Sequence, residues 1–175
     1  GEIFNTHLLA CNFVQENFGI KIKEKADLII ASCGGFPFDI NFYQSHKAID
    51  NVYSGVKEGG VIILFAKCRE GLGSEKFRDW IENNNTLEEI EKKLRIKFEV
   101  PGHTTYSLLE KAEKFNIIVI SSLSEKIIKK MKMKKAENIE DAISLSKKIL
   151  GNNKIKTYII PKAYLTVPIY DSCKT

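Results

Sequence analysis

The sequence has few of the residues that build metal or redox centres. It contains only four cysteines and three histidines among 175 residues. They are Cys11, Cys33, Cys68, Cys173, His7, His46 and His103. No two cysteines form a C-x-x-C pair and no histidines share a local ligand spacing, which excludes a compact zinc or redox motif. We therefore expect reduced thiols and no metal site built from this chain alone.

Long apolar runs are also missing. The longest, residues 28–31 and 61–66, are far shorter than the roughly 20 residues needed to cross a bilayer, so no membrane segment is expected. Residues 1–6 lack the basic start and apolar stretch of a secretory signal, and this predicts a cytoplasmic location. The first residue is glycine, not methionine, which indicates a piece of a longer chain or a tag remnant.

The overall composition is that of a globular protein. Hydrophobic residues make up 43% and charged residues 28% of the chain, and no repeat or low-complexity linker divides it. A single domain over residues 1–175 is expected. The net charge of +5 is concentrated in the lysine-rich residues 126–135, which carry no aromatic side chain to stack on a base. We interpret this stretch as a solvated surface and expect no nucleic-acid partner.

Four short runs rich in isoleucine and valine predict strands. They are residues 26–32, 61–67, 116–121 and 156–160. Their apolar residues are continuous, as in parallel strands that helices cover on both faces. Helical patterns occupy residues 6–18, 41–56, 75–83, a segment capped by Thr86, 105–115, 124–130 and 139–150. The sequence predicts an α/β fold: a Rossmann-like, doubly wound, mostly parallel sheet of about four or five strands with helices on both faces.

In such a sheet, ligands bind outside the carboxyl ends of the strands, here the turns after Ser32, Lys67 and Ser121. The first turn contains Gly34 and Gly35, which allow positive φ or a close approach to a ligand. The helix start that follows offers N–H groups to an anion. A pair of glycines in such a turn is equally common as a purely structural device.

The helix after this turn begins with three polar side chains. Tyr43, Gln44 and Lys47 are spaced so that they gather on one side of its first turns, where they could donate hydrogen bonds to an anion or stack on a flat ring. Alternatively, Tyr43 packs at the rim and Lys47 is a solvated surface lysine.

Two further turns carry candidate substrate ligands. Arg69 and Glu70 follow the second strand and could position a substrate or pair with each other to hold the loop. His103 lies in a turn, residues 100–104, that leads into a helix, and it could act as an acid, a base or a hydrogen-bond donor. A lone histidine there is also typical of a cap or surface residue.

Four ordered motifs share one frame. They are Ala-Ser-Cys-Gly-Gly-Phe-Pro at 31–37, Asp-Ile-Asn-Phe-Tyr-Gln at 39–44, Gly-Gly-Val-Ile-Ile-Leu at 59–64 and Cys-Arg-Glu-Gly-Leu-Gly-Ser at 68–74. Together they resemble the carboxy-terminal domain of the nickel-pincer-cofactor-dependent lactate racemase family, with the likeness strongest over residues 26–120. The resemblance implies half of a two-domain enzyme that inverts a 2-hydroxy acid by reversible hydride transfer on a nickel-pincer nucleotide derived from pyridinium.

The resemblance also implies roles for particular residues. Tyr43 and Gln44 match the family's Tyr-Gln pair and Lys47 the lysine three residues later, which lie over the cofactor and substrate. We expect Lys47 and Tyr43 to be the catalytic residues of this chain. From their places in the ligand turns, and not from the resemblance, Gly34 and Gly35 are assigned to the cofactor, and Arg69 and His103 join Lys47 toward the substrate. The amino-terminal domain, which carries the cofactor-tethering lysine and catalytic histidines, is absent from this sequence, so the chain is expected to be inactive alone.

One position near the predicted substrate site departs from the family's pattern. His103 stands nearest the place where the family's lactate enzymes have a tryptophan, whereas Trp80 lies in a different predicted helix. The expected substrate is therefore another 2-hydroxy acid or a sugar acid. The alternative functions are a nucleotide- or phosphate-binding module without racemase activity, and a scaffold that forms a stable multimer.

Overall fold

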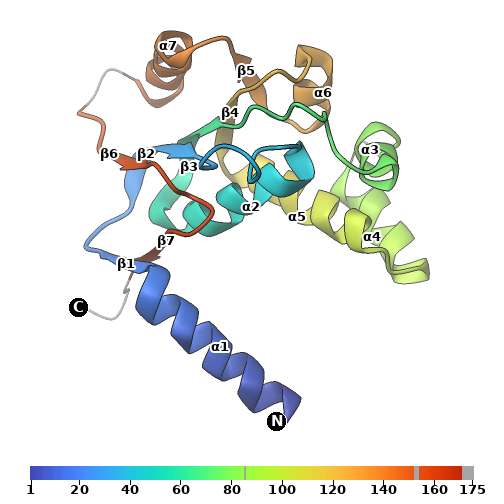
Figure 1. Cartoon of the computed structure of the whole chain (residues 1–175). Coiled ribbons are helices and arrows are strands. Elements are labelled where there is room, and N and C mark those ends of the chain that lie inside the picture. Colours follow the sequence, from blue (N-terminus) through green and yellow to red (C-terminus); the bar gives the residue numbers. More distant parts are fainter. Residues whose placement is uncertain (85, 152–153, 171–175) are drawn as a thin grey trace.

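The computed structural model describes residues 1–84, 86–151 and 154–170. Its elements, in chain order, are α1 (Ile3–Phe18), β1 (Gly19–Ile22), β2 (Ala26–Ser32), α2 (Phe42–Val52), the 3-10 turn η1 (Tyr53–Gly55), β3 (Val56–Phe65), α3 (Glu75–Glu82), α4 (Leu87–Ile96), α5 (Val100–Lys114), β4 (Asn116–Ile120), α6 (Glu125–Lys130), β5 (Lys134–Ala136), α7 (Ile139–Leu150), β6 (Thr157–Ile160) and β7 (Val167–Tyr170). Figure 1 shows how they are arranged.

The four predicted strands lie in one parallel sheet of five, in the order β5-β4-β3-β2-β6. At its centre, Ile30 of β2 pairs with Ile63 of β3, and Ile63 pairs with Ile118 of β4. The chain moves outward from β2 to β5, then returns to place β6 on the other side of β2. The doubly wound α/β prediction is confirmed.

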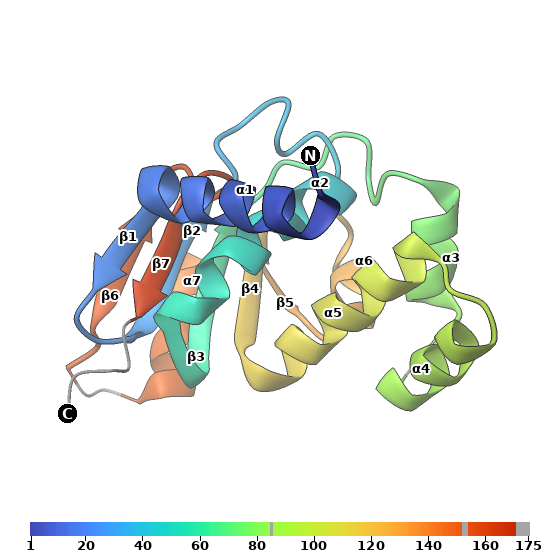
Figure 2. The ribbon, with the colours of Figure 1, turned by 90° about the horizontal axis from the view of Figure 1, so that it is seen from below.

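The two faces of the sheet are covered by different helices. On β3, Ile62 and Leu64 pack into the larger core, which contains buried residues of α2 and α5. Their neighbours Val61 and Ile63 face the smaller core, where α7 contributes the buried Ala142. Figure 2 shows α2 and α5 on the near side of the sheet and α7 behind it. Burial on both faces explains why these strands are continuous apolar runs.

Several predicted boundaries were wrong. The helix expected over residues 41–56 ends at Val52, because the chain turns through η1 and β3 begins at Val56. The lysine-rich stretch contains the edge strand β5, not only a solvated helix. The strands β1 and β7, which pair in parallel as a separate two-stranded sheet, were not predicted. Finally, α5 begins at Val100, so His103 lies in its first turn and not before it.

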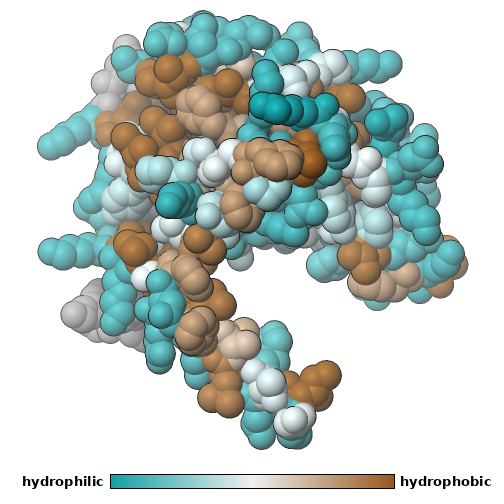
Figure 3. Space-filling view, viewed as in Figure 1, coloured by the Kyte–Doolittle hydropathy of each residue, from teal (hydrophilic) through white to brown (hydrophobic). Residues whose placement is uncertain are grey.

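The helix α1 was predicted, and it stands apart from both cores. It projects from the rest of the molecule in Figure 1, and none of its residues is buried. Ile3 is 84% exposed and Phe13 60% exposed, and Figure 3 shows apolar side chains along this helix. In the described ranges, no helix has the length and apolar character needed to span a membrane.

Candidate functional site

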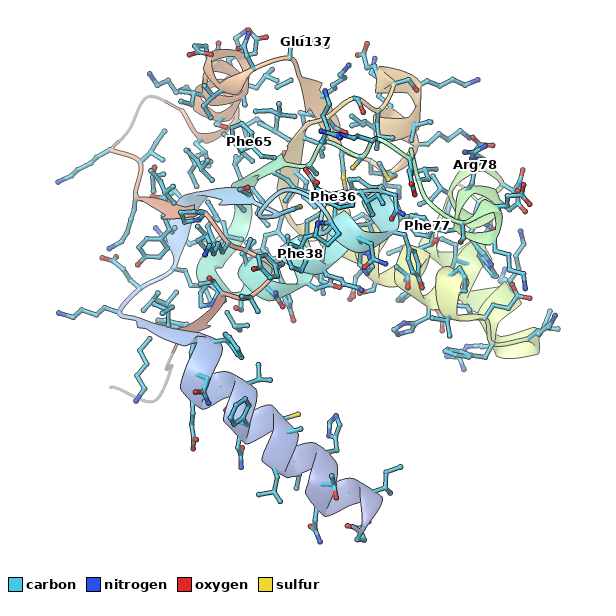
Figure 4. All side chains as sticks on the ribbon, viewed as in Figure 1. Phe36, Phe38, Phe65, Phe77, Arg78 and Glu137 are labelled. Atoms are coloured by element: carbon cyan, nitrogen blue, oxygen red, sulfur yellow. The ribbon has the colours of Figure 1, made fainter. Side chains whose placement is uncertain are left out.

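The three predicted ligand turns meet at one edge of the sheet. Main-chain bonds join Cys33 N–H to the carbonyl of Phe65 (3.1 Å) and Ala66 N–H to the carbonyl of Ile120 (3.1 Å), so the strand ends lie level. Beyond them is a cavity of about 550 Å³ with a largely polar lining. Its polar side chains come from Ser32, Asp39, Lys67, Ser121, Ser122, Lys135 and Glu137, and the rest of its lining from Gly35, Phe65, Ala66 and Ile120. In Figure 4, Phe65 and Glu137 mark this edge and Phe36 the loop that borders it.

The two glycines of the first turn differ in what surrounds them. Both have positive φ, 96° at Gly34 and 82° at Gly35. A Cβ on Gly34 would lie 2.7 Å from the ring of Tyr164, which in turn stacks on Phe38 at 3.6 Å between ring centroids. A Cβ on Gly35 would meet nothing within 4 Å. Gly34 therefore makes room for Tyr164, and only Gly35 leaves space beside the cavity.

The start of α2 is held by the second turn. Phe42 N–H donates to the carbonyl of Gly71 (2.9 Å) and Tyr43 N–H to that of Leu72 (3.2 Å). The side chain of Asn41 caps the helix by accepting from Gln44 N–H at 3.0 Å. The N–H groups that were predicted to bind an anion are thus already hydrogen-bonded within the protein. This counts against a phosphate site of the ordinary helix-start kind.

Of the three polar side chains at this helix start, Lys47 and Gln44 are in contact, as their spacing predicted, whereas Tyr43 packs against other rings. Lys47 Nζ donates to Gln44 Oε1 at 2.7 Å. The half-buried ring of Tyr43 meets Phe77 of α3 edge-on, with centroids 5.1 Å apart, and Figure 4 shows Phe77 beside α2. Within the described ranges, the Tyr43 hydroxyl has no hydrogen-bond partner and Lys47 has no carboxylate partner. A phenol and an ammonium group are therefore available to a ligand.

The other predicted substrate ligands are placed differently. Arg69 and Glu70 are both exposed, and in the part of the chain described they form no ion pair with each other. The loop is held instead by main-chain bonds, Cys68 N–H to the carbonyl of Asp39 (2.8 Å) and Glu70 N–H to that of Ile40 (2.9 Å). Arg69 is left as a second exposed cation beside the start of α2.

His103 does not join this group. It is exposed, and its ring is tilted against Phe98 with centroids 6.0 Å apart. Next to it, Gly102 packs against the indole of Trp80, because a Cβ there would lie 2.7 Å from that ring. No hydrogen bond or ring contact among the described residues links His103 to Tyr43.

Arg78 is a cation at this site that the sequence analysis missed. It lies on α3, four residues after the cap Ser74, and Figure 4 shows it beyond Phe77. Its Nη2 is 4.0 Å from the place where a Cβ on Gly71 would stand, so the guanidinium reaches the loop that holds α2. In the sequence, Arg78 follows the glycine loop and the helix cap Ser74 by a few residues, and this spacing could have indicated that its side chain returns to the loop.

Two buried thiols lie beneath the turns. Burial raises the pKa of the Cys33 thiol to about 12 and also raises the pKa of Cys68. Cys11, Cys33 and Cys68 are free, as expected, while Cys173 lies outside the described residues. In the described part of the chain, no group of three or more histidine, cysteine or acidic residues could hold a metal ion.

Alkylation should separate these thiols. At about pH 8, iodoacetamide is expected to modify Cys11 readily and to leave Cys33 and Cys68 largely unmodified, because buried neutral thiols are poor nucleophiles. Peptide mass spectrometry at each cysteine over time provides the measurement. Equal rates at Cys11 and Cys33 in the native protein would contradict the buried placement, and denaturant should make the rates equal.

Comparison with known proteins identifies relatives. A family model described as the lactate racemase C-terminal domain matches residues 21–167. The lactate racemase of Thermoanaerobacterium thermosaccharolyticum is 31% identical over 166 residues, covering 92% of this chain and 38% of that protein. The lactate racemase of Lactiplantibacillus plantarum is 28% identical over 149 residues, 82% of this chain and 35% of that protein. The chain thus spans well under half the length of these relatives.

Two solved structures are similar to this chain. The lactate racemase apoprotein from T. thermosaccharolyticum matches with a TM-score of 0.81 at 28% identity, over 93% of this chain and 40% of that one. A protein from Thermotoga maritima matches with a TM-score of 0.63 at 12% identity, over 96% of this chain and 42% of that one, which shows a shared fold alone.

Proposed function

The chain belongs to the lactate racemase C-terminal domain family, and on that basis we propose that it covers cofactor and substrate in a racemase or epimerase of 2-hydroxy acids. The observation that carries this proposal is the group formed by Tyr43, Gln44 and Lys47. A phenol without a hydrogen-bond partner in the described ranges and an exposed ammonium group both lie in the first two turns of α2, the helix that follows the first ligand turn. Both groups are held on a helix whose start is tied down by two neighbouring turns.

The side chains present fit the organic part of a nickel-pincer nucleotide. The half-buried Tyr43 ring is fixed by Phe77, so it can lie against a flat pyridinium, and Gln44 keeps its amide N–H groups for an acceptor. Gly35 lines the cavity at the strand ends and leaves open space there, whereas the space at Gly34 is filled by Tyr164. When bound, the cofactor supplies the acceptor for a hydride from the carbinol carbon. Tyr43, Gln44 and Gly35 are the residues of this chain that would contact it.

Lys47 is proposed to hold the substrate carboxylate. Its ammonium group is exposed and bonded to the neutral Gln44 amide, so a carboxylate can replace or join that bond without breaking an ion pair. Arg69 is a second candidate for the same anion, while the ring of His103 lies against Phe98 and makes no contact with this group among the described residues. A fixed carboxylate orients the hydroxyl-bearing carbon toward the cofactor, which is the task of positioning residues.

The remaining part of the enzyme would complete the site. The chain covers 38% of the length of one lactate racemase and 35% of another. A ligand held between this edge and a second domain would be shielded from water when the two close, as a hydride transfer requires. We therefore expect the 175-residue chain to be inactive by itself.

Reconstitution tests the proposal. The purified chain, mixed with the amino-terminal part of its enzyme, the cofactor and a single enantiomer of a 2-hydroxy acid, is expected to restore racemisation measured by chiral chromatography. Omitting either protein part should abolish it. No racemisation with a panel of 2-hydroxy acids and sugar acids would refute the function. Tight binding of a nucleotide to the chain alone, measured by calorimetry, would instead favour the nucleotide-binding alternative.

A further inference from the structure

Behind the Tyr43 group lie three ionisable side chains that the proposed function does not use. His46 and Asp50 are on α2, one turn apart, and Lys111 comes from α5. His46 is 9% exposed and Lys111 8% exposed, which is unusual for a lysine. Such groups are buried only when their charges and hydrogen bonds are satisfied by neighbours.

These side chains form one chain of contacts that ends at Tyr43. Lys111 Nζ lies 2.9 Å from Asp50 Oδ1 and donates to Ser107 Oγ at 2.6 Å. Asp50 Oδ2 lies 3.5 Å from His46 Nε2, a contact that becomes an ion pair when the ring is protonated at both nitrogens. The other ring nitrogen, His46 Nδ1, lies 2.7 Å from the carbonyl oxygen of Tyr43, and because a carbonyl only accepts, Nδ1 carries the proton.

The network also joins two helices. Lys111 lies over the ring of Tyr53, 5.0 Å from its centroid, just beyond the end of α2. Its contact with Asp50 Oδ1 is an ion pair without the alignment of a good hydrogen bond. Because the N–H groups at the helix start also donate to the carbonyls of Gly71 and Leu72, α2 is held at both ends. The carbonyl of Tyr43 is the point where the network reaches the ligand edge.

Stability alone is a weak reason for this arrangement. The pair joins a buried Lys111 to an Asp50 side chain that is 38% exposed. Such pairs add little stability compared with apolar side chains of the same size, because the charges lose part of their hydration. The contacts do fix an orientation, because His46 Nδ1 and Lys111 Nζ form hydrogen bonds to Tyr43 and Ser107, and the Asp50 carboxylate lies between the two side chains. A network of this kind is therefore better suited to fixing an orientation than to strengthening a core.

We propose that His46, Asp50 and Lys111 are positioning residues that hold the first turn of α2, and with it Tyr43 and Lys47, in the orientation that ligand binding requires. This inference rests on the proposed function for the role of Tyr43 and Lys47. Lys111 does not contact Tyr43 and acts on it indirectly, through Asp50 and His46. None of the three residues is proposed to touch the substrate or the cofactor.

The test replaces Lys111 by methionine in the full-length enzyme. The Lys111→Met variant is expected to lose roughly tenfold in kcat/KM per folded molecule, since small misplacements of binding groups have effects of that size or larger. The variant Lys111→Arg, which keeps the charge, should recover most of the activity. The double variant Asp50→Asn with Lys111→Met, which leaves no unpaired charge, should regain thermal stability but not activity.

The matched control is Ser146→Ala. Ser146 is also buried and its hydroxyl donates to the carbonyl of Ala142 at 2.7 Å, but it lies on α7, on the opposite face of the sheet. Its loss should lower stability without changing kcat/KM. If Lys111→Met and Ser146→Ala have the same kcat/KM, within about twofold, the positioning role is wrong.

A second measurement does not depend on racemase activity. In the 175-residue chain labelled with ¹³C-tyrosine, the Tyr43 signal is assigned by its absence in Tyr43→Phe. We expect Lys111→Met to shift or broaden that signal and Ser146→Ala to leave it unchanged. An unmoved signal overturns the positioning inference even if the enzyme racemises. A moved signal in an enzyme without racemase activity supports the positioning and refutes only the proposed function.

Discussion

Replacing Lys47 by alanine is expected to lower the kcat/KM of the full-length enzyme for a 2-hydroxy acid by roughly tenfold or more. A hydrogen bond between two charged groups in a closed site contributes about 1.5–3 kcal/mol, and 1.4 kcal/mol corresponds to a factor of ten. Lys47 has the position for this bond, since its Nζ is 2.7 Å from Gln44 Oε1 and exposed at the ligand edge. Initial rates with each enantiomer provide the measurement.

Two further variants make this result specific. Lys47→Arg keeps the positive charge but changes the geometry, so it should lie between the wild type and Lys47→Ala. Lys92 is an exposed lysine on α4, away from the three ligand turns, and Lys92→Ala should leave the rate unchanged. If Lys47→Ala retains wild-type kcat/KM, Lys47 is a solvated surface lysine and its assigned role is wrong.

The central sheet could be predicted from sequence because its strands carry their own signal. The runs over β2, β3 and β4 are apolar on both faces, and helical patterns separate them. The strands β1 and β7 lack such a signal. Each has four residues, and among the residues that the structure describes they pair only with each other, although they are far apart in the sequence. The strand β5 is an edge strand with exposed lysine, which resembles a solvated segment.

Contacts of the candidate site within α2 could be predicted from the sequence, but contacts between α2 and other elements could not. The spacing of Gln44 and Lys47 within one helix determined their contact. The N–H groups at the start of α2 donate to the carbonyls of Gly71 and Leu72. This contact forms through tertiary packing, so the local sequence does not predict it. The pair formed by Asp50 and Lys111 likewise joins separate helices, so neither the burial of Lys111 nor its contact with Asp50 follows from local sequence.

Gly34 makes room for the ring of Tyr164, so a larger residue at this position should strongly destabilise the fold. Gly34→Ala is expected to lower the free energy of unfolding by about 2–4 kcal/mol, since about 1 kcal/mol of backbone strain at positive φ adds to a steric clash of about 1–3 kcal/mol. The clash arises because the new methyl group would lie 2.7 Å from the ring of Tyr164. Urea denaturation followed by circular dichroism measures the change.

Gly35→Ala is the matched control, because it separates strain from packing. Gly35 has a similar positive φ of 82°, but a Cβ there meets no atom within 4 Å, so only the strain of about 1 kcal/mol should appear. Combining Gly34→Ala with Tyr164→Ala should recover part of the loss, as expected for two groups in direct contact. Equal losses for the two glycine variants would mean that Tyr164 does not fill the space at Gly34. That space would then be open to a ligand, and Gly34 would regain the cofactor-contact role that its packing against Tyr164 argues against.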